Sequence, residues 1–127
     1  MRSVVCALVF VIIIAVSAWA QSQAEMNENA CDQAKKADAE LNSVYSGVLK
    51  KQGNDKLFIE KLKAAQRIWI AFRDAEMAAY YPAKDKQSEY GTVFNMCYCY
   101  EFMDLTQQRT KQLKHWLDDM EEGNVCR

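Results

Sequence analysis

Residues 55–80 read DKLFIEKLKAAQRIWIAFRDAEMAAY, and this stretch decides the fold. It contains neither Gly nor Pro, and apolar residues recur in it every three or four positions, which is the spacing of one face of an α-helix. The pattern predicts a helix over residues 55–80 that ends at Tyr81–Pro82, because proline disfavours the helical conformation in the residue before it. The residues expected to face the core are Phe58, Leu62, Ala65, Trp69 and Phe72.

Two further helical patterns flank this stretch. The first covers residues 32–51, and the turn-forming residues 52–55 (QGND) separate it from the central helix. The other covers residues 92–120, and the polar residues 83–91 before it predict a loop. The chain has only 4 Gly and 1 Pro, so turns are few. We therefore predict an all-α fold, an antiparallel bundle of three helices, or four if the last region is broken. The expected core face of the first helix is Ala34, Ala37, Leu41, Val44, Tyr45 and Val48.

The N-terminal residues have the pattern of a signal peptide. Arg2 precedes an apolar run over residues 4–16, and Ala18 and Ala20 are the small residues that a signal peptidase reads. We expect residues 1–20 to be removed, because the run is too short to span a bilayer comfortably and no basic residues follow it. This leaves residues 21–127 as one domain of about 107 residues, with no stable membrane span after cleavage.

Four cysteines remain in that domain: Cys31, Cys97, Cys99 and Cys126. In an exported protein they predict two disulfides, with three connectivities. Cys97 and Cys99 point about 200° apart on a helix and should not bond to each other. In an up-down bundle the first and third helices start at the same end, which favours Cys31 with either Cys97 or Cys99.

The partner of Cys126 stays open. A straight helix from Cys99 to Glu121 is about 33 Å long, whereas the five residues that follow reach only about 17 Å. Either the last helical region bends or ends early, or Cys126 pairs between chains.

Charge and composition argue against several kinds of function. Only Arg2 among the 16 Lys and Arg lies in the predicted signal peptide, which leaves 15 against 17 Asp and Glu, a net charge of about −2. We expect no nucleic-acid binding, because the chain has no basic stripe and no Gly-rich phosphate loop. We expect no catalytic residues, metal ligands or cofactor, since His115 is the only histidine and no Ser or Cys nucleophile has an evident base.

Three segments at helical spacing carry a family resemblance: residues 37–42 with Tyr45, residues 65–69 with 72–76, and residues 105–106 with 109–110 and Leu113. Together they resemble the LprI-type lysozyme-inhibitor family of small exported bacterial proteins, over roughly residues 31–116. The resemblance implies a periplasmic or secreted protein that binds and blocks lysozyme. The alternative is a structural or accessory envelope protein that recognises another periplasmic partner and leaves lysozyme unaffected. Family members often carry a cysteine where this chain has Met77, so their bridges are not transferred to it.

The polar residues of these segments predict a structural network at the helix seams. We expect Arg73 and Arg109 to pair with Asp38 or Asp74 and to hydrogen-bond Asn42 and Gln66, which would fix the helix register. The alternative is a surface site that meets a partner. The residues assigned to this motif are Asp38, Asn42, Tyr45, Gln66, Trp69, Arg73 and Arg109.

Two surfaces are candidates for partner binding. The first is the acidic end, which we define as Asp118, Asp119, Glu121 and Glu122; four carboxylates would attract a basic lysozyme. Its alternative is a solubilising helix end. The second is the tyrosine turn, Tyr80 and Tyr81, whose side chains could anchor an interface or could seal the end of the bundle.

Overall fold

The structure, a computed structural model, describes the backbone of residues 2–118 and the side chains of residues 22–118. Helices account for the regular structure of this part of the chain, and no strand occurs in it, which confirms the all-α prediction. The elements are α1 (Arg2–Lys51), α2 (Lys56–Tyr80), α3 (Lys86–Tyr90), the 3₁₀ turn η1 (Gly91–Val93) and α4 (Phe94–Lys114).

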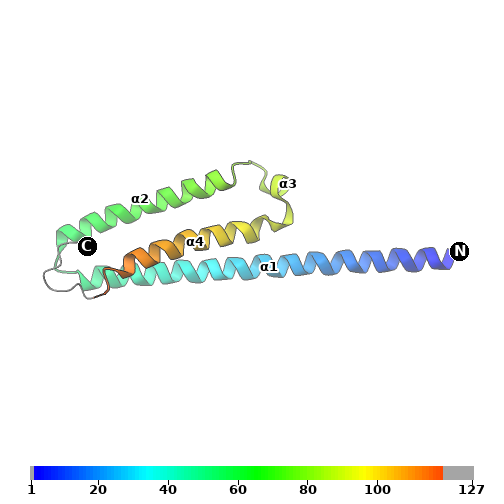
Figure 1. Ribbon diagram of the computed structural model, residues 1–127, viewed down its shortest axis with the longest axis horizontal. Helices are drawn as coiled ribbons and strands as arrows, with labels where there is room; N and C mark the ends of the chain where they lie inside the picture. Colours follow the sequence, from blue (N-terminus) through cyan, green and yellow to red (C-terminus); the bar gives the residue numbers. More distant parts are fainter. Residues whose placement is uncertain (1, 119–127) are drawn as a thin grey trace.

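The three long helices run up, down and up. α2 returns antiparallel to α1, and α4 lies alongside α1 in the same direction, while the N-terminal part of α1 extends beyond the other helices (Figure 1). α1 begins at Arg2, well before the predicted start at residue 32, and its backbone stays helical without a break up to Lys51. Among the described residues, no helix combines the length and apolar character needed to cross a membrane.

The core lies mainly between α1 and α4. Positions three and four apart on α1 are buried, and small alanines at one end give way to larger side chains toward the other. Five buried residues form the central cluster, and Trp69 and Trp116 pack partly buried against it. The predicted face of α1 is therefore confirmed. The cluster consists of Leu41, Val44, Val48, Leu62 and Leu113.

α2 presents only part of the predicted face to the core: Phe58, Leu62 and Trp69 contact it. Leu62, Gln66 and Met77 are buried, whereas Ala65 is exposed and Phe72 is 51% exposed. The apolar residues of α2 form two stripes, one that faces the core and one that faces outward. The inner stripe also contains Gln66, whose burial is tolerated because its side chain accepts a hydrogen bond from Arg109. The expectation that Ala65 and Phe72 face the core was wrong.

The last helical region ends earlier than residue 120. α4 stops at Lys114, and the amides of Trp116 and Leu117 bond to carbonyls only three residues back. This tighter turn brings Trp116 edge-on to Phe58, with ring centroids 5.8 Å apart. It also seats Leu117 on Gly47, where a Cβ atom would lie 3.4 Å from Leu117 Cδ2. Packing of these two side chains explains a helix end that no Gly or Pro marks.

The connection over residues 83–91 is more ordered than the predicted loop. It contains the short helix α3, whose first turn is capped by Asp85, and the Asp85 side chain accepts a hydrogen bond from the Ser88 amide at 3.0 Å. Gly91 follows with φ of +68°, a conformation that favours glycine. The chain thereby turns from α3 into η1 and α4.

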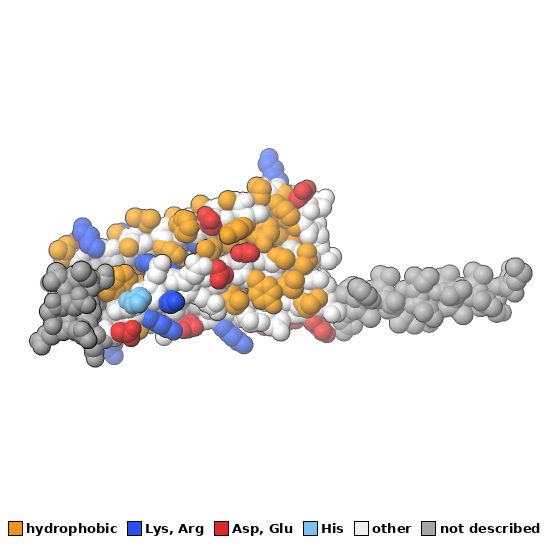
Figure 2. Space-filling model, in the orientation of Figure 1, with side chains coloured by type: hydrophobic (Ala, Val, Ile, Leu, Met, Phe, Trp, Pro, Cys, Tyr) orange, Lys and Arg blue, Asp and Glu red, His pale blue; other side chains and the backbone are white. Residues whose placement is uncertain are grey.

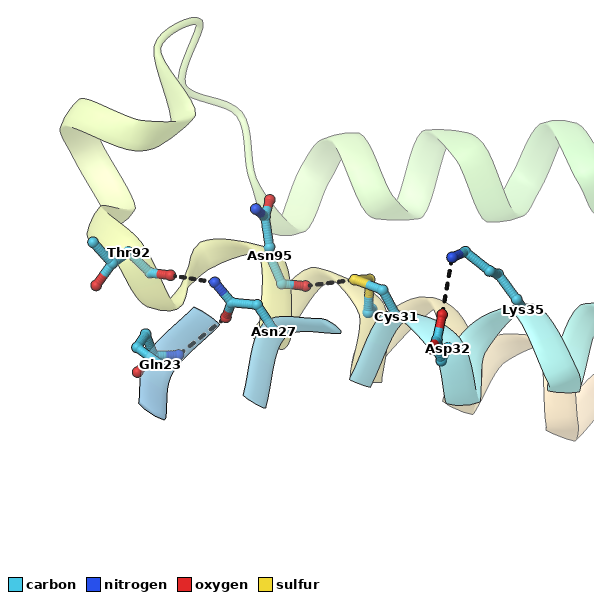
Figure 3. Close-up of a disulfide and its surroundings, with 8 residues drawn as sticks. Gln23, Asn27, Cys31, Asp32, Lys35, Thr92 and Asn95 are labelled. Carbon is cyan, nitrogen blue, oxygen red and sulfur yellow. Dashed lines mark hydrogen bonds and ion pairs between the residues drawn. A yellow bond between two sulfur atoms is a disulfide. The ribbon is translucent and has the colours of Figure 1, made fainter. Parts of the chain in front are cut away.

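One disulfide, Cys31–Cys99, joins the start of the packed part of α1 to α4 (Figure 3). The Cα atoms are 4.9 Å apart, and this bond confirms one of the two predicted pairings. Beside it, the Asn27 side-chain amide donates to the Thr92 carbonyl at 2.9 Å, so a polar contact also ties α1 to η1, directly before α4. Cys97 is a half-buried free thiol, which corrects the expectation that it is bonded. Cys126 lies outside the described residues.

Candidate functional site

Arg73 is the centre of a polar and aromatic cluster at the seam of the three long helices. Its guanidinium donates from Nε and Nη2 to Asp74 Oδ1 at 3.0 and 2.9 Å, and its Nη1 lies 3.8 Å from Asp38 Oδ1 on α1. Its Cζ atom also lies 4.6 Å from the ring centre of Phe102 on α4 and 5.3 Å from that of Trp69. One side chain therefore contacts α1 and α4 from α2.

Arg109 forms the second polar crossing, between α4 and α2. Its Nε donates to Gln66 Oε1 at 3.0 Å, and its Nη1 donates to Gln112 Oε1 at 3.1 Å. Its Nη2 is buried and makes no hydrogen bond. Burial lowers the pKa of the Arg109 guanidinium below its usual value, because desolvation disfavours the charged form.

The predicted network is thus present in most of its parts. Arg73 reaches both Asp38 and Asp74, and Arg109 bonds Gln66, as expected. Asn42 differs, because its amide donates to Asp38 at 3.1 Å along α1 and orients the carboxylate instead of meeting an arginine. The remaining two motif residues, Tyr45 and Trp69, pack against the hydrophobic core.

A recess opens beside this network and the disulfide. It has a volume of about 330 Å³ and lies between α1 and α4. Apolar groups form most of its lining, and the Asp38 carboxylate, whose side chain is 42% exposed, is the acidic group in it. Sequence reasoning missed this recess, although Asp38 and Cys31 were both identified. The lining residues are Cys31, Ala34, Lys35, Asp38, Tyr98, Cys99 and Phe102.

The two tyrosines of the predicted tyrosine turn have separate roles. Tyr81 packs edge-on against Tyr90 and Phe94, with ring centroids 5.3 and 5.2 Å apart. Burial raises the pKa of its phenol, and nearby Cys97 and Glu101 add to the increase. Tyr80 is 51% exposed. Tyr81 therefore seals the end of the bundle, and of the two only Tyr80 presents a largely free aromatic surface.

The acidic end is described only at its first residue. Asp118 is exposed, and Asp119, Glu121 and Glu122 lie outside the described residues. Because Trp116 packs on Phe58, near the start of α2, the acidic end begins about the length of α2 away from Tyr80. For the 25 residues of α2 that length is about 37 Å, so Asp118 and Tyr80 do not belong to one patch.

The fold and these features define a class: a small all-α protein outside the cytoplasm, closed by a disulfide and by arginine-centred contacts between its helices. The family model described as Lysozyme inhibitor LprI matches residues 15–113, most of the chain, and the protein therefore belongs to the LprI family. A search of curated proteins and of solved structures found no match to the chain. Within residues 22–118, no group of three or more His, Cys, Asp or Glu side chains is placed to hold a metal ion.

Proposed function

We propose that this protein acts outside the cytoplasm, after removal of residues 1–20, by binding lysozyme and blocking its active site or access to it. The observation that carries the proposal is the match of the LprI lysozyme-inhibitor family over residues 15–113. The disulfide agrees with an oxidising compartment, where lysozyme is encountered. A rigid surface loses less conformational entropy when it binds a partner, and the disulfide between α1 and α4 restrains these two helices.

We propose the recess as the contact site. Its mostly apolar walls suit the methylene groups of a long basic side chain, and the Asp38 carboxylate suits the charge at the end of that side chain. The basic residue of the lining, Lys35, is itself paired with Asp32 at 2.9 Å. Asp38 is held in place from two directions, by the Asn42 amide at 3.1 Å and by Arg73 at 3.8 Å. A carboxylate has further acceptor sites beyond these two contacts, so it can take a bond from a partner.

The test is inhibition of lysozyme-driven lysis of a cell-wall suspension by the oxidised protein, against several lysozyme types. We expect inhibition of at least one basic lysozyme, and we expect Asp38→Asn to weaken it by roughly tenfold or more. Asp104→Asn is the matched control, because Asp104 is an exposed carboxylate outside the recess and, like Asp38, accepts a bond from an amide four residues later, Gln108 at 2.6 Å.

Each outcome decides one part of the proposal. Equal inhibition by wild type and Asp38→Asn would reject the recess and leave the function standing. No inhibition of any lysozyme type by the folded, oxidised protein would reject the function and favour an accessory envelope protein with another partner.

A further inference from the structure

α2 carries a second apolar stripe that faces away from the core. Ile68 is 71% exposed, Leu57 64% and Phe72 51%. At 100° per residue these side chains lie on one line along the helix, roughly 140° around the axis from the line through Leu62 and Gln66. Hydrophobic side chains follow the α2 edge of the molecule in Figure 2. The outer stripe consists of Leu57, Ala64, Ala65, Ile68, Ala71, Phe72, Ala75 and Ala79.

This outer stripe is unusual for a solvated helix. Lys61 is the only charged residue that interrupts it along α2, and its large side chains sit at its centre and at one end. A helix in contact with water on this side would be expected to carry polar residues there. The distribution instead fits a helix that packs on two sides.

The stripe is complementary to itself in an antiparallel arrangement. If a two-fold axis passes level with Ile70, residue numbers that sum to 140 face each other across it, so Ile68 meets the partner's Phe72 and Ala65 meets the partner's Ala75. The two large side chains of each chain then fill the centre, and the alanines on either side allow close approach.

Charge on the flank of the stripe selects the same arrangement. Arg67 and Asp74 lie on one side of it, and both are exposed. In an antiparallel pair of helices, this flank of one chain faces the same flank of the other. Arg67 of each chain then lies beside the partner's Asp74, which gives two such pairs in the dimer. A parallel pair would bring opposite flanks together, so Arg67 and Asp74 would not meet each other across it. Asp74 already accepts from Arg73 through one oxygen, Oδ1, which leaves its other oxygen for a second partner.

We propose that the occupant of this stripe is a second copy of the chain, and that the protein forms a two-fold dimer through antiparallel α2 helices. A single pair of helices about 37 Å long buries less than a standard interface. The dimer should therefore be reversible and depend on concentration. The inference does not rest on lysozyme binding, and its test does not use lysozyme.

The first experiment is sedimentation velocity of the oxidised protein across a concentration series, with free thiols blocked so that no disulfide between chains contributes. We expect a monomer–dimer equilibrium, and Ile68→Asp should weaken it by roughly tenfold or more. Ile70→Asp is the matched control, since Ile70 is 40% exposed and lies on the other side of the same helix. Circular dichroism should show unchanged helix content in both variants.

A charge exchange then tests the orientation. Arg67→Glu and Asp74→Arg should each dimerise poorly alone, because each pairs like charges at both ends of the interface. Mixing the two variants should restore association. In the mixed dimer the introduced glutamate of one chain faces the introduced arginine of the other, and the unchanged Asp74 faces the unchanged Arg67, so both ends pair opposite charges. A protein that stays monomeric at every concentration, a dimer that tolerates Ile68→Asp, or a mixture that associates no better than its components would each overturn the proposal.

Discussion

The guanidinium of Arg109 on α4 donates to the side-chain carbonyl of Gln66 on α2 at 3.0 Å, and this bond crosses a seam at which Gln66 is only 7% exposed. Because Gln66 is buried, solvent is a poor substitute for its Arg109 partner. The pair therefore couples the position of α2 to that of α4 more strongly than a surface contact could.

Truncation of Gln66 should be costly for that reason. Gln66→Ala leaves the Arg109 Nε without its partner, and we expect a loss of about 1–3 kcal/mol in the free energy of unfolding. The double variant Gln66→Leu with Arg109→Met should recover part of this loss, because both polar groups are removed together. Urea denaturation of Gln66→Leu, of Arg109→Met and of the double variant measures the coupling. Strictly additive losses would show that the two side chains do not act as a pair.

The disulfide should dominate the stability of the fold. Replacing both Cys31 and Cys99 by Ser opens a loop with a sequence separation of 68, and we expect a loss of about 4 kcal/mol. Cys97→Ser is the control and should cost less than about 1 kcal/mol, because Cys97 is a half-buried free thiol. Thermal melts under oxidising conditions compare the two. A larger loss from Cys97→Ser would mean that the bridge runs through Cys97.

Trp69 should behave as a core residue. It packs against the central cluster and lies 5.3 Å from the Arg73 guanidinium, so truncation removes both contacts. We expect Trp69→Ala to cost about 3 kcal/mol, the lower end of the range for buried tryptophan because the side chain is only partly buried. Trp69→Phe should retain most of the stability. Near-native melting of Trp69→Ala would instead assign this tryptophan to a binding surface.

Substitutions at Gly47 test how closely Leu117, in the turn after α4, packs against α1. An added methyl group meets Leu117 at 3.4 Å, an ordinary contact distance, and alanine favours the helix. Gly47→Ala should therefore raise the free energy of unfolding by up to about 1 kcal/mol. Gly47→Leu should lower it, because the larger side chain displaces Leu117. The sign of the two changes, read from urea denaturation, checks the packing described for this turn.

The acidic end should act on the rate of association with lysozyme. Neutralising Asp118, Asp119, Glu121 and Glu122 together should slow association with a basic lysozyme and flatten its dependence on salt, because charges at an interface rim chiefly steer the encounter. The matched control neutralises four exposed carboxylates elsewhere in the chain, Glu25, Glu28, Glu60 and Glu89. Stopped-flow kinetics at several ionic strengths compare them. Equal effects of both variants would indicate net charge alone and reject a local site.

The inward face of α1 was predictable because its sequence contains only one apolar stripe, from Ala34 to Val48. The inward face of α2 was predictable only in part. Leu62 and Trp69 were assigned to it correctly, but Phe72 is as apolar as Trp69, and the partners of Gln66 and Arg73 decide which of the two turns inward. The end of α4 depends on Trp116 meeting Phe58, a contact between residues far apart in the chain. Similarly, the choice between Cys97 and Cys99 follows from the rotation of α4 about its axis, which the spacing of residues within α4 does not fix.

The recess could not be predicted from the sequence, for a related reason. Its walls come from two helices far apart in the sequence, with Ala34 on α1 and Phe102 on α4 among the residues that line it. Asp38 was identified through its motif, yet a motif gives residue type and spacing and does not show whether a hollow lies beside the carboxylate.

The position of the Cys31–Cys99 bridge also bears on how the protein is made. The bridge encloses all of α2 and α3, so before oxidation the packed helices are held together by noncovalent contacts alone. Under the export proposed above, a newly synthesised chain in the reducing cytoplasm lacks this bond, which suits passage through a translocation channel that accepts extended polypeptide. Oxidation after export would then close the loop and favour the folded state, so that the change of compartment would set the moment at which the chain matures.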